Sequence, residues 1–214
     1  LLKSSVHNIM TTFEKCGIVE KTLNNSKYRL GLKLVALGNH NQQCYNLLSM
    51  IKPFMKQIAV TTGETVYLAM PYGNQIIYAE RYSPLENILG NSIRGTVAPM
   101  YCTGVGKAML SYLHEEKWDE VIDAGLQKFT DSTIVEPNEF REELILTRNR
   151  GYSIDNMEHE YGVKCVAVPI LNIGGELSAG LSISGPSLRF NNDKIQEYAM
   201  LLQKCAEKIK EILL

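Results

Sequence analysis

A glycine-rich segment stands out among the residues whose types and spacing could do chemistry. Thr103-Gly104-Val105-Gly106 opens a predicted helix over residues 103–113. The first backbone N–H groups of a helix lack partners within it and lie at its positive end, so they bind anions readily. The alternative interpretation is that Gly104 serves only to permit a tight turn. The segment therefore predicts an anion site or, in the simpler reading, a turn.

Two serines could supply hydroxyl groups to such a site. Ser182 and Ser184 are two residues apart in a predicted strand over residues 177–184. Successive side chains of a strand point to opposite faces, so both hydroxyls face the same side. Taken alone, such a pair is more often two ordinary strand serines.

Other side chains are of types used in metal binding or covalent catalysis, but their pattern is a weaker signal. Four side chains are of types that bind metal ions: Cys102, Cys165, His159 and Asp155. The last three are also the types that make up a cysteine nucleophile with its base and orienting acid. Their spacing fits no standard zinc pattern, and the chain has no Gly-x-Ser-x-Gly elbow, Walker loop or complete dinucleotide fingerprint. We therefore expect no metal, no cofactor and no enzymatic activity, and keep thiol or metal sensing as an alternative.

The charge distribution divides the chain at about residue 33. Residues 1–33 hold six basic and two acidic side chains, a net charge of +4, and the remainder holds 16 basic and 21 acidic side chains, a net charge of −5. A short basic segment before a mildly acidic body predicts a polyanion partner for the first part and a sensing domain for the second.

Composition narrows the class of protein. The 214 residues are 45% hydrophobic and 21% charged, which is typical of a globular protein with one large or two small domains. No apolar run is long enough for a membrane span, so no membrane partner is expected. The five cysteines are odd in number and widely spaced, which favours the reducing cytoplasm. The N-terminus has no initiator Met and no signal peptide, so we expect a longer parent chain.

The elements expected in the basic segment are those of a DNA-binding motif. Apolar side chains recur at helical spacing over residues 2–15, Gly17 stops the helix, and two short strands flank a turn over residues 22–27. A helix followed by a small basic hairpin is typical of a winged helix-turn-helix, although an amphipathic surface helix before any hairpin has the same pattern.

Helices and strands alternate in the rest of the chain. We expect helices over 31–38 and 44–62, the second bent or divided at Pro53, then a hairpin over 66–79 and a strand within 88–97. Further helices are expected over 103–113, 115–124, 139–149 and 192–214, with strands over 151–155, 163–172 and 177–184. Mixed antiparallel strands and helices predict an α+β fold.

Several motifs in the correct order resemble the IclR-type transcriptional regulators. They are Lys3-Ser4-Ser5-Val6-His7, Cys16-Gly17-Ile18-Val19-Glu20, the run from Tyr28 to Leu34, the block Pro99–Ala108, Arg150-Gly151-Tyr152, Cys165–Ile170 and Ala179–Pro186. Together they span essentially the whole chain. Tyr101 stands where the family usually has His, and Cys102 where a small residue is common. These two differences make it less justified to assign a relative's ligand to this chain.

The resemblance implies a division of the chain and its partners. Residues 1–30 would be the C-terminal part of a winged helix-turn-helix, 31–43 a linker helix and 44–214 a GAF-like effector-binding domain with a mainly antiparallel sheet flanked by helices. It implies a homodimer, often paired into a tetramer, that binds operator double-stranded DNA. A small carboxylate effector would modulate that binding. The main alternative is a free-standing sensor of a small molecule, thiol state or metal.

The resemblance also assigns residues to each role. The expected effector-binding residues are Thr103, Gly104, Val105, Asp155, Val163, Cys165, Ser182 and Ser184. The expected DNA-binding residues are Lys3, Ser4, Ser5, His7, Asn8, Lys27 and Arg29.

Overall fold

A computed structural model describes residues 1–22, 27–39, 42–84 and 94–213 of the chain. Within it the chain divides into two compact units, Leu1–Leu47 and Leu48–Leu214. Among the described residues no helix is both long enough and apolar enough to cross a bilayer.

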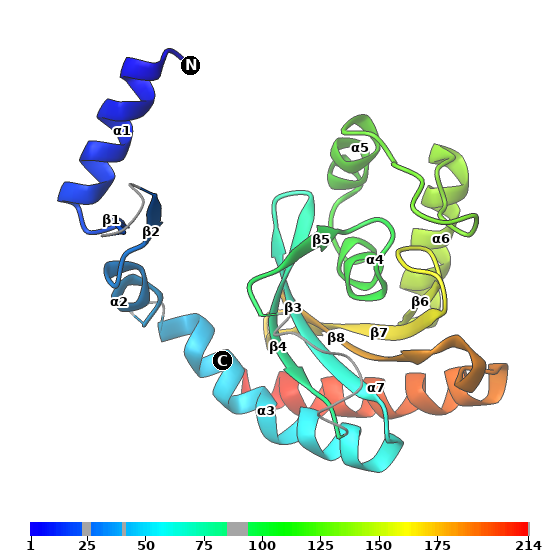
Figure 1. Cartoon of the computed structure of the whole chain (residues 1–214). Helices are drawn as coiled ribbons and strands as arrows, with labels where there is room; N and C mark the ends of the chain where they lie inside the picture. The colour runs from blue at the N-terminus through cyan, green and yellow to red at the C-terminus, as the bar shows by residue number, and fades with distance from the viewer. Residues whose placement is uncertain (23–26, 40–41, 85–93, 214) are drawn as a thin grey trace. The chain divides into compact units, whose positions relative to one another are not determined.

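The first unit is a helix followed by a small hairpin and a second helix (Figure 1). Helix α1 is Lys3–Lys15, strands β1 (Val19–Lys21) and β2 (Tyr28–Leu30) pair antiparallel, and α2 is Lys33–Asn39. Gly17 ends α1 with a φ of +71°, a conformation that favours glycine, and its N–H bonds the Glu14 carbonyl. The predicted turn between the strands lies, over residues 23–26, outside the described residues.

Helix α3 (Gln42–Thr62) runs through Pro53 without a break, so the predicted division there is wrong. Pro53 lies on the exposed side of the helix. The buried face, with Ile51, Met55 and Ile58, holds the turns on either side of the proline in one helix.

The second unit is built on a six-stranded antiparallel sheet in the order β5-β4-β3-β8-β7-β6. The strands are β3 (Thr65–Tyr72), β4 (Gln75–Tyr82), β5 (Val97–Pro99), β6 (Ser153–Asn156), β7 (Val163–Leu171) and β8 (Leu177–Pro186). At the centre of the sheet, β3 pairs with β8 of the β7–β8 hairpin, which lies about a hundred residues further along the chain, so residues near 65, 165 and 184 come together.

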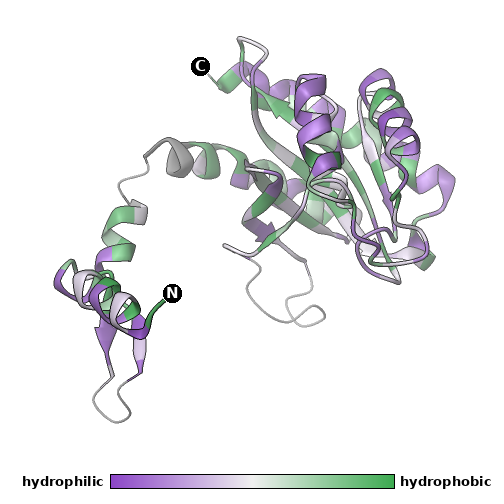
Figure 2. Cartoon of the chain, turned by 90° about the horizontal axis from the view of Figure 1, so that it is seen from above, coloured by the Kyte–Doolittle hydropathy of each residue, from purple (hydrophilic) through white to green (hydrophobic). Residues whose placement is uncertain are grey.

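Helices cover both faces of this sheet. They are α4 (Gly104–Leu110), α5 (Glu115–Asp123), α6 (Pro137–Arg150) and α7 (Asn192–Ile212), with a 3-10 turn, η1, at Ser187–Arg189. In Figure 1, α4, α5 and α6 lie above the sheet and the red α7 lies below it. Figure 2 shows much green in the central strands and much purple on the surrounding helices, as expected for a sheet buried on both faces.

Alternation along β8 separates the two layers. Leu181 and Ile183 are fully buried on the face toward α7, whose apolar stripe includes Tyr198 and Leu202. Ser182 and Ser184 point to the opposite face, which α4 covers. One face of the sheet is therefore apolar core, and the other combines core with polar side chains.

These observations confirm the predicted α+β fold with a mainly antiparallel sheet flanked by helices. The strand expected within 88–97 is wrong where it can be compared. The strand begins only at Val97, residues 94 and 95 form a turn, and residues 88–93 lie outside the described residues. The helix expected over 103–113 ends at Leu110, because a turn follows there.

Candidate functional site

Helix α4 packs unusually close to the sheet. A Cβ atom added to Gly104 would lie 2.7 Å from Cys165 Sγ, and one added to Gly106 would lie 2.2 Å from the Met100 carbonyl oxygen. The Ser153 hydroxyl donates to the Gly104 carbonyl at 2.6 Å. Glycine at these positions therefore lets the start of α4 sit directly on the sheet, beside Cys165.

Four polar side chains form a row across the sheet below α4, here called the polar row: Asp155, Cys165, Ser184 and Thr65. They are consecutive register partners on β6, β7, β8 and β3, so they share one face. Each is less than 9% exposed. A buried row of small polar groups has little value for packing, which favours a role in binding.

A second rank of partners lies beside the polar row on the same face. Ser182 is opposite Ala167 on one side and Tyr67 on the other. The rings of Tyr67 and Tyr78 lie 5.4 Å apart between centroids. Among the described residues neither phenol hydroxyl has a hydrogen-bond partner. The two phenols add uncharged donors to the face.

Burial keeps the two thiols of the site protonated. Burial and the Asp155 carboxylate raise the pKa of Cys165 to about 12, and hydrogen bonding with Ser184 and Ser182 opposes the rise. Burial also raises the pKa of Cys102 well above its usual range. Reactive cysteines need lowered pKa values, so neither thiol is activated for nucleophilic or redox chemistry.

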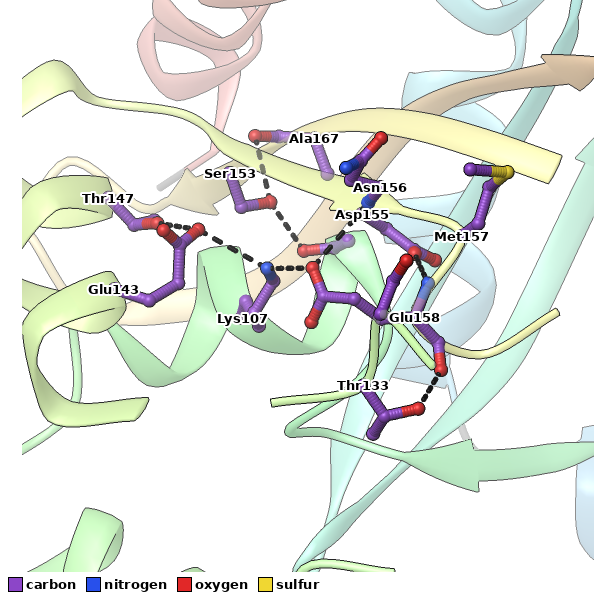
Figure 3. Close-up of polar contacts among 12 residues, drawn as sticks. Lys107, Thr133, Glu143, Thr147, Ser153, Asp155, Asn156, Met157, Glu158 and Ala167 are labelled. Carbon is purple, nitrogen blue, oxygen red and sulfur yellow. Dashed lines mark hydrogen bonds and ion pairs between the residues drawn. The ribbon is translucent and has the colours of Figure 1, made fainter. Parts of the chain in front are cut away.

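An ion cluster lies beside Asp155 (Figure 3). Lys107 is 1% exposed, and its Nζ lies 2.5 Å from Glu158 Oε1 and 3.2 Å from Glu143 Oε1. Arg150 Nη2 donates to the same Glu143 oxygen at 2.8 Å. Two cations thus face three carboxylates when Asp155 is counted, an excess of one negative charge.

That excess acts on Asp155. Burial, and then repulsion by Glu158, raise the pKa of Asp155 to about 7. Its Oδ1 accepts the Glu158 N–H at 2.7 Å. Asp155 can therefore exchange a proton near neutral pH, and in its protonated form it donates a hydrogen bond.

The loop after β6 is fixed by hydroxyl groups. Met157 has a φ of +64°, uncommon for a residue with a side chain. The Thr130 hydroxyl donates to the Met157 carbonyl and the Thr133 hydroxyl to the Glu158 carbonyl, both at 2.6 Å. These contacts hold Glu158 in place over Lys107.

A cavity of about 250 Å³ opens at the far end of the polar row. Thr65 and Ser184 of the row line it, together with Tyr161, Val163 and Pro186. Its rim includes Glu64, which accepts two hydrogen bonds of 2.6 Å from Arg189. The row thus leads from a buried acid to a cavity whose exposed lining surface is mostly apolar, although Glu64, Ser83 and Arg189 also line it.

The sequence-predicted effector residues are mostly brought together. Gly104 lies against Cys165, and Asp155, Cys165 and Ser184 are neighbours in the polar row, with Ser182 in the next rank. Val105 packs against Gly180, while Val163 lines the cavity. The Thr103 hydroxyl instead donates to the Pro99 carbonyl at 2.9 Å and does not cap α4.

The metal and nucleophile readings find little support in this arrangement. In the part of the chain that the structure describes, no group of three His, Cys, Asp or Glu side chains is arranged to hold a metal ion. The His159 ring lies 5.3 Å from that of Phe129, against which it packs.

The predicted DNA-binding residues lie on the first unit. Lys3, Ser4, His7 and Asn8 are exposed on α1, and Ser5 is half-buried. Lys27 and Arg29 are exposed on the hairpin. Arg29 donates to Glu20 Oε2 through Nε at 3.0 Å and Nη2 at 2.8 Å, so this cation already has a partner.

Sequence reasoning missed Thr65, Tyr67, Tyr78 and the Lys107 ion cluster. The strand residues carry no local signal, because only the β3–β8 register places them beside Ser182 and Ser184. A signal for Lys107 was available: a lysine between glycine and alanine in a short apolar helix must find a buried partner.

Comparison with known proteins gives one consistent group. The family described as "Bacterial transcriptional regulator IclR C-terminal" matches residues 40–211. The transcriptional regulator KdgR of Escherichia coli is 32% identical over 208 residues, covering 97% of this chain and 79% of that protein.

Two solved structures extend this similarity to the fold. The crystal structure of Thermotoga maritima IclR has a TM-score of 0.78 and 32% identity, covering 98% of this chain and 85% of that one. An IclR homolog from Microbacterium hydrocarbonoxydans, crystallised with 4-hydroxybenzoate, has a TM-score of 0.83 at 23% identity, covering 99% of this chain and 85% of that one.

Proposed function

The chain belongs to the IclR family of bacterial transcriptional regulators, whose members are not enzymes, and we propose that it binds operator DNA under the control of a small organic acid. In this proposal residues 1–30 are the C-terminal part of a winged helix-turn-helix, 31–43 form a linker helix and 44–214 form the effector domain. The regulator acts on DNA in the cytoplasm as a homodimer, which pairs into a tetramer.

One observation carries the effector proposal: the polar row lies buried beneath the start of α4. Its hydroxyl and thiol groups, with the first backbone N–H groups of α4 at Gly104 and Val105, are uncharged donors suited to a carboxylate. The complex of a family relative with 4-hydroxybenzoate, a small aromatic acid, supports this class of ligand.

Control of DNA binding follows from linkage between the two sites. If the acid changes operator affinity by some factor, the operator must change the affinity for the acid by the same factor. A dimer must place its recognition helices at half-sites about one helical turn, or a multiple, apart. A small change in that spacing is enough to alter operator affinity.

A thermal-shift screen against small hydroxy, keto and sugar acids tests the effector site. An acid at about a hundred times its dissociation constant should stabilise the protein by about 2.7 kcal/mol. For a protein of this size that raises the melting temperature by about 5–10 °C. Ser184→Ala should abolish most of the shift, because it removes a hydroxyl from the polar row.

Ser178→Ala is the matched control for this screen. Ser178 is on the same strand, β8, six residues and about 20 Å from Ser184, at the register shift near the start of the strand. It should keep the full shift. A shift that survives Ser184→Ala, or the absence of a shift from every acid, would contradict an acid site at the polar row.

The salt dependence of operator binding tests the DNA-binding residues. Lys27→Ala should reduce the slope of log operator affinity against log salt concentration by about one, because one phosphate contact is lost. Arg29→Ala should do the same, whereas Lys128→Ala, an exposed lysine of the effector domain, should leave the slope unchanged. Unchanged slopes for both hairpin variants would exclude a phosphate contact by the hairpin.

A further inference from the structure

The cavity at the end of the polar row is larger than a minimal acid requires. Its volume is about 250 Å³. An apolar cavity of about 150 Å³ is enough for a benzene ring. A two- or three-carbon acid seated on Cys165 and Ser184 would leave this space without a ligand atom.

The walls of the cavity offer apolar contact more than hydrogen bonds. The Thr65 hydroxyl donates to Ser83 Oγ at 3.2 Å. The Tyr161 hydroxyl bonds Asp131, accepting its N–H and donating to Oδ2, both at 3.1 Å. Because these two hydroxyls already have partners, the cavity surface offers mainly apolar contact, to which Val163 and Pro186 contribute.

The charged side chains around the cavity indicate at which end of the polar row the carboxylate of a bound acid lies. Among the described residues, Arg189 is the only cation lining this cavity, and it is held by both oxygens of the buried Glu64. Such a neutralised pair gives a carboxylate no net attraction. The other end of the row, near Gly104 and Cys165, offers uncharged donors and is the better place for the carboxylate. The neighbouring Asp155 must then be in its protonated form, which burial and Glu158 favour by raising its pKa to about 7.

We propose that this cavity is an outer subsite that takes the apolar chain or ring of an organic acid whose carboxylate lies at the Gly104 end of the polar row. The inference rests on the proposed effector function and deepens it: the effector is an acid with an apolar part of about six to nine carbon atoms. Ser184 belongs to both regions and lies between them.

A series of straight-chain 2-oxo acids from three to eleven carbons, with apolar chains of one to nine carbons, tests the subsite by calorimetric titration. Each methylene buried contributes about 0.8 kcal/mol, so the dissociation constant should fall about fourfold per carbon until the cavity is filled. Val163→Trp fills part of the cavity, so the gain should stop at a shorter chain, and the longest acids should bind tenfold or more weakly than to the unmodified protein.

Val97→Trp is the matched control, because Val97 also begins a strand and is half exposed, and it does not line this cavity. It should leave the whole series unchanged. Tyr161→Ala is a second variant in case Val163→Trp does not fold. It should weaken the longest acids several-fold and leave the shortest unaffected.

The outcomes separate the two levels of the proposal. If no acid of any length binds, the effector function itself fails. If short acids bind and Ser184→Ala abolishes this, but affinity does not rise with chain length or Val163→Trp leaves the series unchanged, the outer subsite alone is overturned.

Discussion

Replacing Lys107 with methionine should lower the free energy of unfolding of the effector domain by about 3–5 kcal/mol at pH 8. Methionine has a similar length, so little volume is lost. The loss comes from charge, because Glu158 and Glu143 remain buried or half-buried without the ammonium group that lies within 3.2 Å of both. Denaturant titration followed by the fluorescence of Trp118 measures it.

Trp118 is well placed to report this change. It is the only tryptophan, is 1% exposed, and donates its indole N–H to the carbonyl of Leu110, the last residue of α4. Adding Glu158→Gln to Lys107→Met should recover part of the loss, because it removes one uncompensated charge. Lys128→Met, at an exposed ion pair with Asp131, should change stability by no more than about 0.5 kcal/mol. A loss below 1 kcal/mol for Lys107→Met would show that the cluster is open to water.

Asp155→Asn should flatten the pH dependence of stability. The pKa of Asp155 is raised to about 7 in the folded protein, against about 3.9 for an exposed aspartate, so the folded state binds this proton more tightly. The stabilisation is fully present below about pH 4 and is lost as pH rises through about 7. It amounts to at most about 4 kcal/mol between pH 4 and pH 8.

The variant should therefore be more stable than the unmodified protein at pH 8, since an amide cannot ionise but can still accept the Glu158 N–H. Denaturant titrations at pH 5, 6, 7 and 8 measure the difference. Asp123→Asn, at an exposed position at the end of α5, should leave the pH dependence unchanged. Parallel pH profiles for Asp155→Asn and the unmodified protein would show that Asp155 ionises freely in the fold.

Local sequence signals were enough to predict most elements, and the reasons are specific. The alternation in Leu181-Ser182-Ile183-Ser184 gave both the strand and its two faces, and Gly17 gave the end of α1. The predicted division at Pro53 was wrong because the effect of a proline on a helix depends on which side of the helix it lies. The strand expected before Val97 was wrong because the sequence pattern alone does not show where pairing with β4 begins.

The site was predictable only as far as single residues could be matched to a family. Asp155, Cys165 and Ser184 were expected as separate members of a pocket, and their alignment in one row depends on the registers of three strand pairs. Thr65 and Tyr67 enter through a fourth strand that is about a hundred residues away in sequence. The buried partner of Lys107 was equally out of reach, since Glu158 meets it only through the loop fixed by Thr130 and Thr133.

The complete burial of α4 has a consequence for how this protein can diverge. All seven of its residues are buried, so a substitution there disturbs the core at the same time as the carboxylate end of the pocket. Tyr161 and Val163 are partly exposed and can change with little cost in stability. Relatives that respond to new acids should therefore differ first at this outer wall, while the glycines of α4 stay fixed.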